Sequence, residues 1–102
     1  MILEIATFQI TPGKEKQFEA GVAQAAPLFD QAEGCRGMAL WRGVETPSSY
    51  RLLVKWETLE HHTEMFRNSP AFAQWRALVG GFFASPPSVE HFDTAFIPSD
   101  AS

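Results

Sequence analysis

The segment from Trp56 to Phe66, WETLEHHTEMF, holds the side chains best suited to chemistry in this sequence. Its adjacent histidines, His61 and His62, can accept protons or bind metal ions near neutral pH. Neighbouring residues of a helix point about 100° apart, so the two rings cannot bind one ion from a single helix face. We therefore expect a site of one histidine, with His61 in solvent and His62 turned inward.

His62 is our candidate for a catalytic base. It shares a predicted apolar helix stripe with Leu59, Met65 and Phe66, which places it between helix and sheet. A neutral imidazole in such a cavity could accept the proton of a phenol. The alternative is a core histidine whose ring is hydrogen-bonded to a backbone carbonyl.

Arg76 is our candidate for anion stabilisation. It falls on the same predicted helix face as Phe72 and Val79, where a guanidinium could stabilise a phenolate or a superoxide-like anion. In the alternative interpretation, its aliphatic stem packs on the core and its head reaches solvent.

Glu4 interrupts the apolar run ILEIATF and shares the predicted inner face with Ala6 and Phe8. A carboxylate in such surroundings would have a raised pKa and could serve as a base. The interpretation that we favour from sequence is an edge position or an ion pair with Arg42.

Six large apolar side chains could form the walls of an aromatic-binding pocket, although aromatic residues at this spacing also suit a plain hydrophobic core. These substrate-binding candidates are Trp41, Trp56, Met65, Phe66, Phe72 and Trp75.

No metal site is expected, because the spacing of His61, His62 and His91 matches no known ligand pattern. Cys35 is the only cysteine, which excludes an internal disulfide and favours a reducing, cytoplasmic setting. It follows a predicted helix C-terminus, where the helix dipole disfavours a thiolate nucleophile.

Charge and composition exclude several classes of partner. The net charge is −4, and the eight lysines and arginines are scattered, so we expect no nucleic acid and no membrane surface as partner. The N-terminus has no basic region and carries Glu4 within its apolar run, which argues against a signal peptide or a membrane span.

The elements that must position these residues follow from periodicity and turn signals. We predict strands at 2–11, 35–44, 50–57 and 85–96, a helix at 14–33, and a split helical region that starts at Thr58 and again at Pro70. This βαββαβ order predicts an α+β, ferredoxin-like antiparallel sheet with its helices on one face. We expect one domain over residues 1–97 and a C-terminal tail at 98–102.

The second face of this sheet would be bare, and we assign Leu3, Ile5 and Leu53 to it. The chain also has nine phenylalanines and three tryptophans, more than the core of a small monomer needs. We therefore expect a homodimer formed through the sheet face.

Four segments carry a family resemblance: TPGKE after the first strand, AEGCRG after the first helix, VKWET at the end of the third strand, and NSPAFAQW. Through them, residues 2–97 resemble the antibiotic biosynthesis monooxygenase family, small dimeric α+β barrels that include quinol monooxygenases and haem-degrading members. The resemblance implies oxygenation of an electron-rich aromatic, such as a quinol or a polyketide phenol, without a cofactor.

The chain departs from the family pattern at the expected site positions. Quinol-oxidising members commonly carry histidines where this sequence has Met65 and Ala71. The asparagine, tryptophan and histidine of the haem-degrading branch fall on Ala6, Met65 and Arg76. Haem degradation by that mechanism is therefore not expected.

The sequence thus predicts a cofactor-independent monooxygenase with His62 and Arg76 as its catalytic residues. The alternatives are a non-catalytic dimer of the same fold that binds a small ligand, and a structural relative without a pocket. A cavity of a few hundred Å³ with His62 or Arg76 at its wall would favour chemistry, whereas tight aromatic packing would exclude it.

Overall fold

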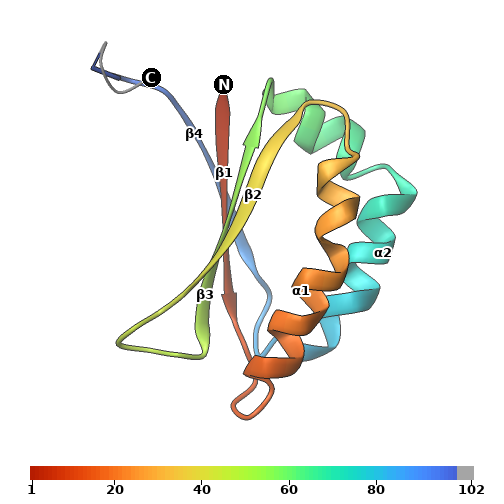
Figure 1. The fold of residues 1–102 in the computed structure, drawn as a ribbon, viewed down its shortest axis with the longest axis vertical. Coiled ribbons are helices and arrows are strands. Elements are labelled where there is room, and N and C mark those ends of the chain that lie inside the picture. Colours follow the sequence, from red (N-terminus) through yellow and green to blue (C-terminus); the bar gives the residue numbers. More distant parts are fainter. Residues whose placement is uncertain (99–102) are drawn as a thin grey trace.

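The sheet consists of four strands in the spatial order β2-β3-β1-β4, and every neighbouring pair is antiparallel. The strands are β1 (Ile2–Gln9), β2 (Cys35–Arg42), β3 (Ser49–Trp56) and β4 (Ser88–Asp93). In this computed structural model, which describes residues 1–98, the helices cover one face of the sheet (Figure 1). The predicted ferredoxin-like α+β fold is confirmed.

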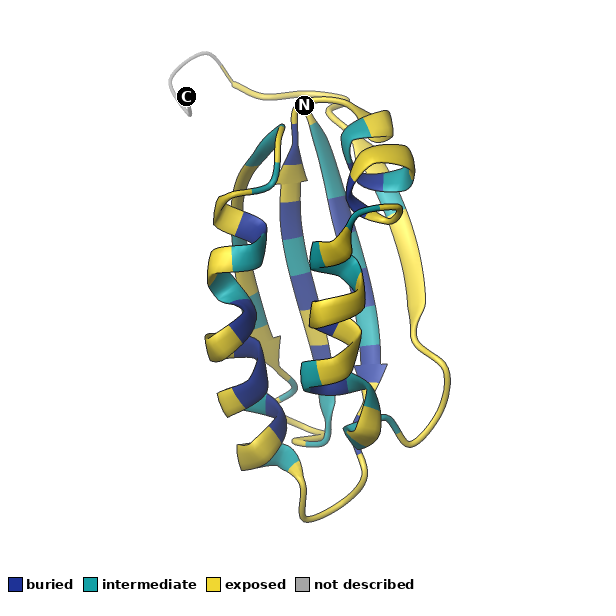
Figure 2. Cartoon of the chain, turned by 90° about the vertical axis from the view of Figure 1, so that its right-hand side faces the viewer, coloured by how far each residue is buried: buried dark blue, intermediate teal, exposed yellow. Residues whose placement is uncertain are grey.

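Three helical elements form the covering layer, and a short 3₁₀ turn η2 (Gly80–Phe82) follows them. They are α1 (Glu15–Asp30), the π-helix η1 (His61–Phe66) and α2 (Pro70–Val79). Figure 2 shows their buried residues turned toward the sheet and their exposed residues turned outward. The predicted apolar stripe of the first helix is confirmed, since Phe18, Val22, Ala25 and Phe29 are all buried.

Helix α1 ends at Asp30, three residues before the predicted end at Glu33. Gly34 follows in the left-handed region, with φ of +81°. A Cβ atom at this position would lie 2.3 Å from the ring of His61. The glycine therefore ends the turn and also leaves room for the first residue of η1.

The π-helical turn changes which side chains are buried. The backbone N–H of Arg67 donates to the carbonyl of His62, an i→i+5 bond. His62 and Phe66 are buried, as predicted, but Leu59 and Met65 are 39% and 47% exposed. The predicted stripe is therefore wrong for Leu59 and Met65, because it assumed α-helical periodicity.

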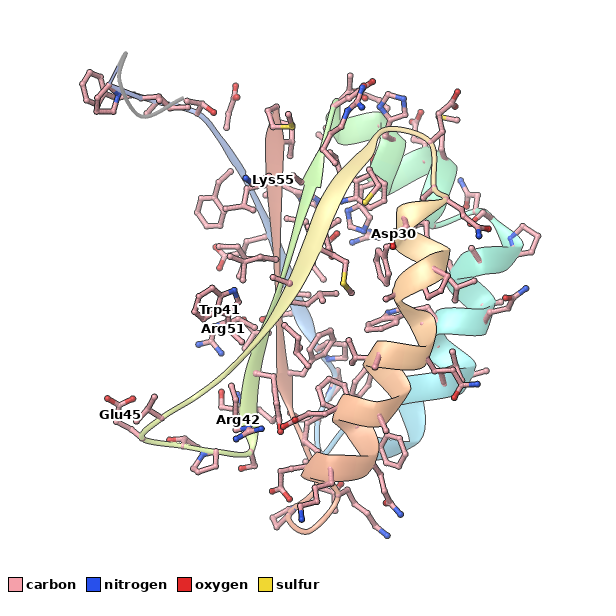
Figure 3. All side chains as sticks on the ribbon, in the orientation of Figure 1. Asp30, Trp41, Arg42, Glu45, Arg51 and Lys55 are labelled. Carbon is pink, nitrogen blue, oxygen red and sulfur yellow. The ribbon has the colours of Figure 1, made fainter. Side chains whose placement is uncertain are left out.

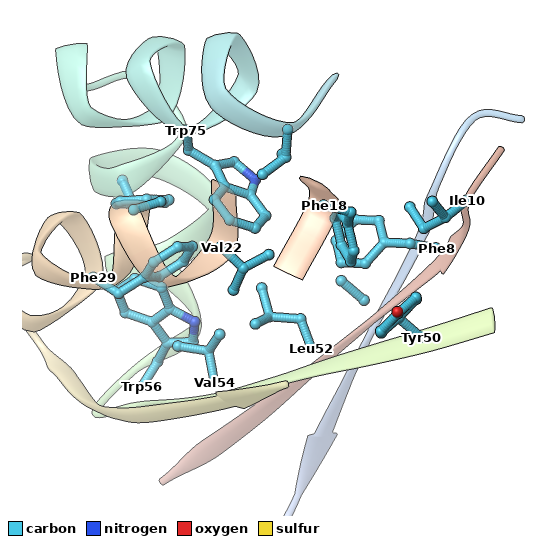
Figure 4. Packing of buried hydrophobic residues seen from close by; sticks show 14 residues of the cluster. Phe8, Ile10, Phe18, Val22, Phe29, Tyr50, Leu52, Val54, Trp56 and Trp75 are labelled. Atoms are coloured by element: carbon cyan, nitrogen blue, oxygen red, sulfur yellow. The ribbon is translucent and has the colours of Figure 1, made fainter. Parts of the chain in front are cut away.

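The two faces of the sheet differ in what covers them. Glu4, Ala6 and Phe8 point toward the helices and are buried, as the alternation predicts. Aromatic and aliphatic side chains fill the space between the layers (Figure 4). On the other side of the sheet Trp41, Arg51 and Lys55 project away from the helices (Figure 3), and no helix within residues 1–98 covers this face.

Arg42 pairs with Glu19 instead of Glu4, which corrects the ion pair favoured from sequence. Its Nε and Nη2 atoms donate to the two carboxylate oxygens of Glu19 at 2.8 and 2.9 Å. The hydroxyl of Tyr50 donates to Oε2 of Glu19 at 2.5 Å. This cluster fastens α1 to β2 and β3.

The predicted last strand, 85–96, is shorter in the structure, where β4 spans Ser88–Asp93. Of the predicted tail at 98–102, residues 99–102 lie outside the described residues. The domain boundary at 97 stays a prediction.

Candidate active site

A pocket of about 380 Å³ lies between the sheet and the helical layer. Most of its wall is aromatic or aliphatic, with Phe66, Phe72 and Trp75 among the lining residues. This composition suits a flat, apolar ligand of small-molecule size. Four lining side chains carry ionisable or charged groups, namely Glu4, His62, Arg67 and Arg76.

Strand register brings two of the polar groups of this region together. Glu4 on β1 is the Cα partner of His91 on β4, and directly opposed residues of neighbouring strands point to the same face. The π-helix η1 then places His62 above this pair. Both His62 and Glu4 are nearly inaccessible to solvent, at 3% and 4% exposure.

Two hydrogen bonds and one close polar contact connect Trp56, Glu4, His62 and His91. Nε1 of Trp56 donates to Oε1 of Glu4 at 3.0 Å, and Nε2 of His62 lies 3.3 Å from the same oxygen. Nδ1 of His62 lies 2.8 Å from Nε2 of His91. Both ring nitrogens of His62 are therefore in polar contact, whereas both contacts to Glu4 use Oε1, and no side chain within residues 1–98 is hydrogen-bonded to Oε2.

Burial sets the charges of the site. It raises the pKa of Glu4 to about 6, although the Trp56 hydrogen bond and the positive charge of Arg67 oppose this shift. Burial lowers the pKa of His62 to about 4, and the charges of Arg67 and His91 act in the same direction. Near neutral pH, Glu4 is thus ionised and His62 is neutral. The contact between them is therefore the close approach of a neutral imidazole to a carboxylate rather than an ion pair.

Two guanidinium groups line the pocket and reach solvent. Arg76 is exposed, and its guanidinium carbon lies 6.0 Å from the centre of the Phe72 ring. Arg67 is also exposed and follows η1 directly. Within residues 1–98, neither side chain forms an ion pair, so both charges are available to an anion. Arg67 was missed from the sequence, because its approach to Glu4 depends on the π-helical turn.

Three of the six predicted substrate-binding residues line the pocket and three do not. Phe66, Phe72 and Trp75 line the pocket. Trp56 does not line the pocket; it is fully buried, and its indole N–H donates a hydrogen bond to Glu4. Trp41 is 62% exposed on the opposite face of the sheet, so the expectation that it shares this pocket is corrected.

Met65 lies at a second, shallower depression of about 340 Å³, together with Ala71. These are the two positions at which the family resemblance led us to look for histidines. Both lie outside the pocket that contains Glu4 and His62. Glu4, His62, Arg67 and Arg76 therefore line a pocket separate from the one that Met65 and Ala71 line.

His61 and Cys35 stand apart from the pocket lining. His61 is partly buried, where the sequence predicted a solvated residue. Its backbone N–H donates to Oγ1 of Thr58 at 3.3 Å, and its Nδ1 lies 2.8 Å from the same atom. Desolvation by burial is the main cause that raises the pKa of the Cys35 thiol, which disfavours a thiolate.

Residues 1–98 contain no cluster of three or more potential metal ligands. None of the helices in the same range has the length and apolarity needed to cross a membrane.

The sequence profile of the family described as antibiotic biosynthesis monooxygenase matches residues 1–78. The chain belongs to this family. The uncharacterized protein YczJ of Bacillus subtilis is 42% identical over 92 residues, which are 90% of this chain and 97% of YczJ. A crystal structure of a proposed antibiotic biosynthesis monooxygenase from Bordetella bronchiseptica is 52% identical, with a TM-score of 0.91 over 93% of this chain and 97% of that one.

Solved structures of lower sequence identity share the fold. SnoaB of Streptomyces nogalater, a cofactor-independent oxygenase, is 16% identical with a TM-score of 0.82 over 96% of each chain. At this identity the likeness extends to the fold alone. Family membership and the 52% identical relative support a general function of the antibiotic biosynthesis monooxygenase type for the present chain.

Proposed function

We propose that this protein is a cofactor-independent monooxygenase that oxidises a small electron-rich aromatic molecule, such as a quinol or a polyketide-like phenol, in the pocket between sheet and helices. The observation that carries the proposal is Glu4, a buried carboxylate with one uncommitted oxygen at the wall of an aromatic-lined pocket. A base with a pKa near 6 is largely ionised at neutral pH and still basic enough to assist a phenol.

The geometry favours Glu4 over His62 as the base. A neutral imidazole accepts a proton through one ring nitrogen only, and both nitrogens of His62 already contact protein groups. Oε2 of Glu4 takes the proton of the substrate hydroxyl, and the electron pair of the broken O–H bond stays on the substrate as a phenolate. His62 supports Glu4 in this arrangement.

Arg67 and Arg76 stabilise the phenolate that this proton transfer forms. A phenolate in the pocket lies among apolar walls, where a nearby positive charge acts strongly. Arg76, predicted for this role, and Arg67 both line the pocket. The anion then reacts with dioxygen: one oxygen atom enters the product and the other leaves as water. The substrate supplies all the electrons, so the reaction needs no external reductant.

The decisive experiment follows oxygen consumption with a panel of hydroquinones and anthrones. We expect turnover by the wild type and a loss of at least about 100-fold in Glu4→Gln, the usual scale for removal of a general base. Glu60→Gln, which changes an exposed carboxylate, is the matched control and should retain full activity. Equal rates in Glu4→Gln and wild type would exclude Glu4 as the base, and no turnover of any compound would contradict the proposed reaction.

A second candidate function is binding of the same class of ligand without turnover. The absence of histidines at positions 65 and 71 favours it, since the resemblance ties quinol oxidation to them. Trp75 lines the pocket, so its fluorescence should report an aromatic ligand. Saturable quenching without oxygen consumption would identify a binding protein.

We also propose that the chain forms a homodimer through the uncovered face of the sheet. Leu3, Ile5 and Leu53 lie on this face and are only partly buried, and Phe92 and Trp41 are 46% and 62% exposed there. Exposed apolar surface of this kind is characteristic of subunit interfaces. Light scattering after size exclusion tests the proposal, and a monomer at micromolar concentration would overturn it.

The free Cys35 thiol favours a reducing compartment, and we propose the cytoplasm. Cell fractionation with a specific antibody tests this location.

A further inference from the structure

We infer that His91 is a positioning residue: it fixes the tautomer of His62, and His62 in turn holds Glu4 in the ionised form that accepts the substrate proton. The catalytic consequence rests on the proposed function, but the tautomer and its effect on Glu4 do not. No motif in the sequence links these three residues, which come from β4, η1 and β1.

The donors and acceptors of the chain have one consistent arrangement when Glu4 is ionised. A carboxylate oxygen can only accept, so its approach to within 3.3 Å of Nε2 of His62 favours the imidazole hydrogen on Nε2. In a neutral imidazole, Nδ1 is then the acceptor. Since Nδ1 lies 2.8 Å from Nε2 of His91, the His91 nitrogen must donate.

Strand pairing gives His91 this position. Its Cα atom lies opposite that of Glu4 across the β1–β4 pair, so both side chains point into the helical layer from neighbouring strands. His91 is partly exposed at the sheet edge, and burial together with Arg67 lowers its pKa. It is therefore neutral near pH 7, with one donor nitrogen and one acceptor nitrogen.

Without the donor from His91, His62 is free to carry its hydrogen on Nδ1. Its Nε2 lone pair would then face Oε1 of Glu4 at 3.3 Å. This contact favours a protonated Glu4, which can donate to that lone pair. Loss of His91 should therefore raise the pKa of Glu4 and reduce the fraction that is able to act as a base.

Other charged or titratable groups near Glu4 must be held constant in any test. Arg67 follows η1 and favours the ionised carboxylate, and Trp56 on β3 donates to it. Cys35 on β2 interacts electrostatically with Glu4, and Arg76 on α2 lines the same pocket. Within residues 1–98, His62 is the side chain that is hydrogen-bonded to the ring of His91, while Arg67 acts on His91 through its charge alone.

The first test needs no substrate. Nitrogen NMR of 15N-histidine-labelled protein at pH 7.5 distinguishes the two imidazole tautomers. We expect the Nε2–H form for His62 in the wild type and a shift to the Nδ1–H form in His91→Phe. His91→Gln, whose amide can donate, should restore the Nε2–H form. His61, which is held by Thr58, is the internal control and should not change.

A wild-type His62 in the Nδ1–H form would overturn the inference, and this outcome requires no variant to fold. An unchanged tautomer in a folded His91→Phe protein would overturn it as well.

Carbon NMR of the Glu4 side-chain carboxyl provides the second measurement. We expect its titration midpoint to rise by about one pH unit in His91→Phe, a tenfold change in the protonation equilibrium, and to return in His91→Gln.

The kinetic consequence separates this inference from the proposed function. If the enzyme is active, the acid limb of its kcat/KM profile should move with the carboxyl titration, while activity at high pH stays near the wild-type value. A shifted titration with no oxygen consumption in any protein would reject the monooxygenase and leave the role of His91 intact. Full activity with an unshifted titration would reject the role of His91 alone.

Discussion

Nε2 of His62 lies 3.3 Å from Oε1 of Glu4, and this contact joins the π-helix η1 to the central strand β1 at the wall of the pocket. Both groups are buried and their pKa values move in opposite directions, Glu4 upward and His62 downward. An ionised carboxylate next to a neutral imidazole is therefore the resting state near pH 7. Such displaced pKa values are characteristic of sites that transfer protons.

The pH dependence of activity should follow Glu4. We expect kcat/KM to rise with pH through a midpoint of about 6 and to level off above it, because the base must be ionised. His62, with a pKa of about 4, should contribute no step above pH 5. Initial rates of oxygen consumption between pH 5 and 8.5 measure the profile, and a rate that falls between pH 5 and 7 would contradict the assignment.

Replacement of Trp56 by phenylalanine should raise the pKa of Glu4 and so disfavour its ionised form. The indole N–H donates to Oε1 and lowers the pKa of the carboxyl, so its loss should shift the acid limb of kcat/KM upward. Loss of a hydrogen bond to a buried charge should also reduce the free energy of unfolding by about 1.5 to 3 kcal/mol. Trp41→Phe, on the opposite face of the sheet, is the control and should leave the acid limb unchanged.

Glu4→Gln should change how stability depends on pH. The folded-state pKa of Glu4 lies above its unfolded value, so its favourable contribution is complete below about 4.5 and is lost as pH rises through about 6. A shift of this size corresponds to about 2 kcal/mol. Urea unfolding should therefore show the variant gaining stability relative to wild type between pH 4.5 and 7. A constant difference over this range would rule out the raised pKa.

His62 should oppose this trend in the wild type. Its folded-state pKa lies below the unfolded value, so the stability present above about 6.5 is lost as pH falls toward about 4. His62→Gln should therefore lose less stability than wild type between pH 6.5 and 4. The same urea series measures it, and parallel curves for the two proteins would refute the lowered pKa.

The cluster of Glu19, Arg42 and Tyr50 should contribute to the stability of the fold and not to catalysis. Tyr50→Phe removes the hydrogen bond to Glu19 and should lower the free energy of unfolding by about 1 kcal/mol. Tyr50 does not line the pocket, so kcat/KM should be unchanged. A large loss of activity in a stably folded variant would show that this cluster and the pocket are coupled.

Leu53→Glu should weaken the proposed homodimer. Leu53 lies between Ile5 and Ala39 on the uncovered face of the sheet, and a charge buried in an apolar interface is strongly unfavourable. Light scattering should show the variant shifted toward monomer. Leu59→Glu, a similar change on the helical side, should leave the oligomeric state as in wild type.

Local patterns predicted much of the fold because they depend on neighbours in the chain. Alternation in ILEIATF placed Glu4, Ala6 and Phe8 on the inner face, and the spacing of Phe18 and Val22 placed α1 on the core. The same reasoning placed Met65 with His62 and was wrong, because a π-helical turn is not visible in apolar spacing.

The sequence by itself determined the βαββαβ order and the inward direction of His62, and it left open the setting of Glu4 and whether the aromatic side chains line a pocket or fill a core. Only the tertiary structure decided which atoms meet. Strand register placed His91 opposite Glu4, and the wider turn of η1 brought His62 between them and Arg67 beside them. The physical reason is range: periodicity fixes the direction of a side chain relative to its own element, whereas hydrogen-bond partners and pKa values depend on distances between elements far apart in the chain.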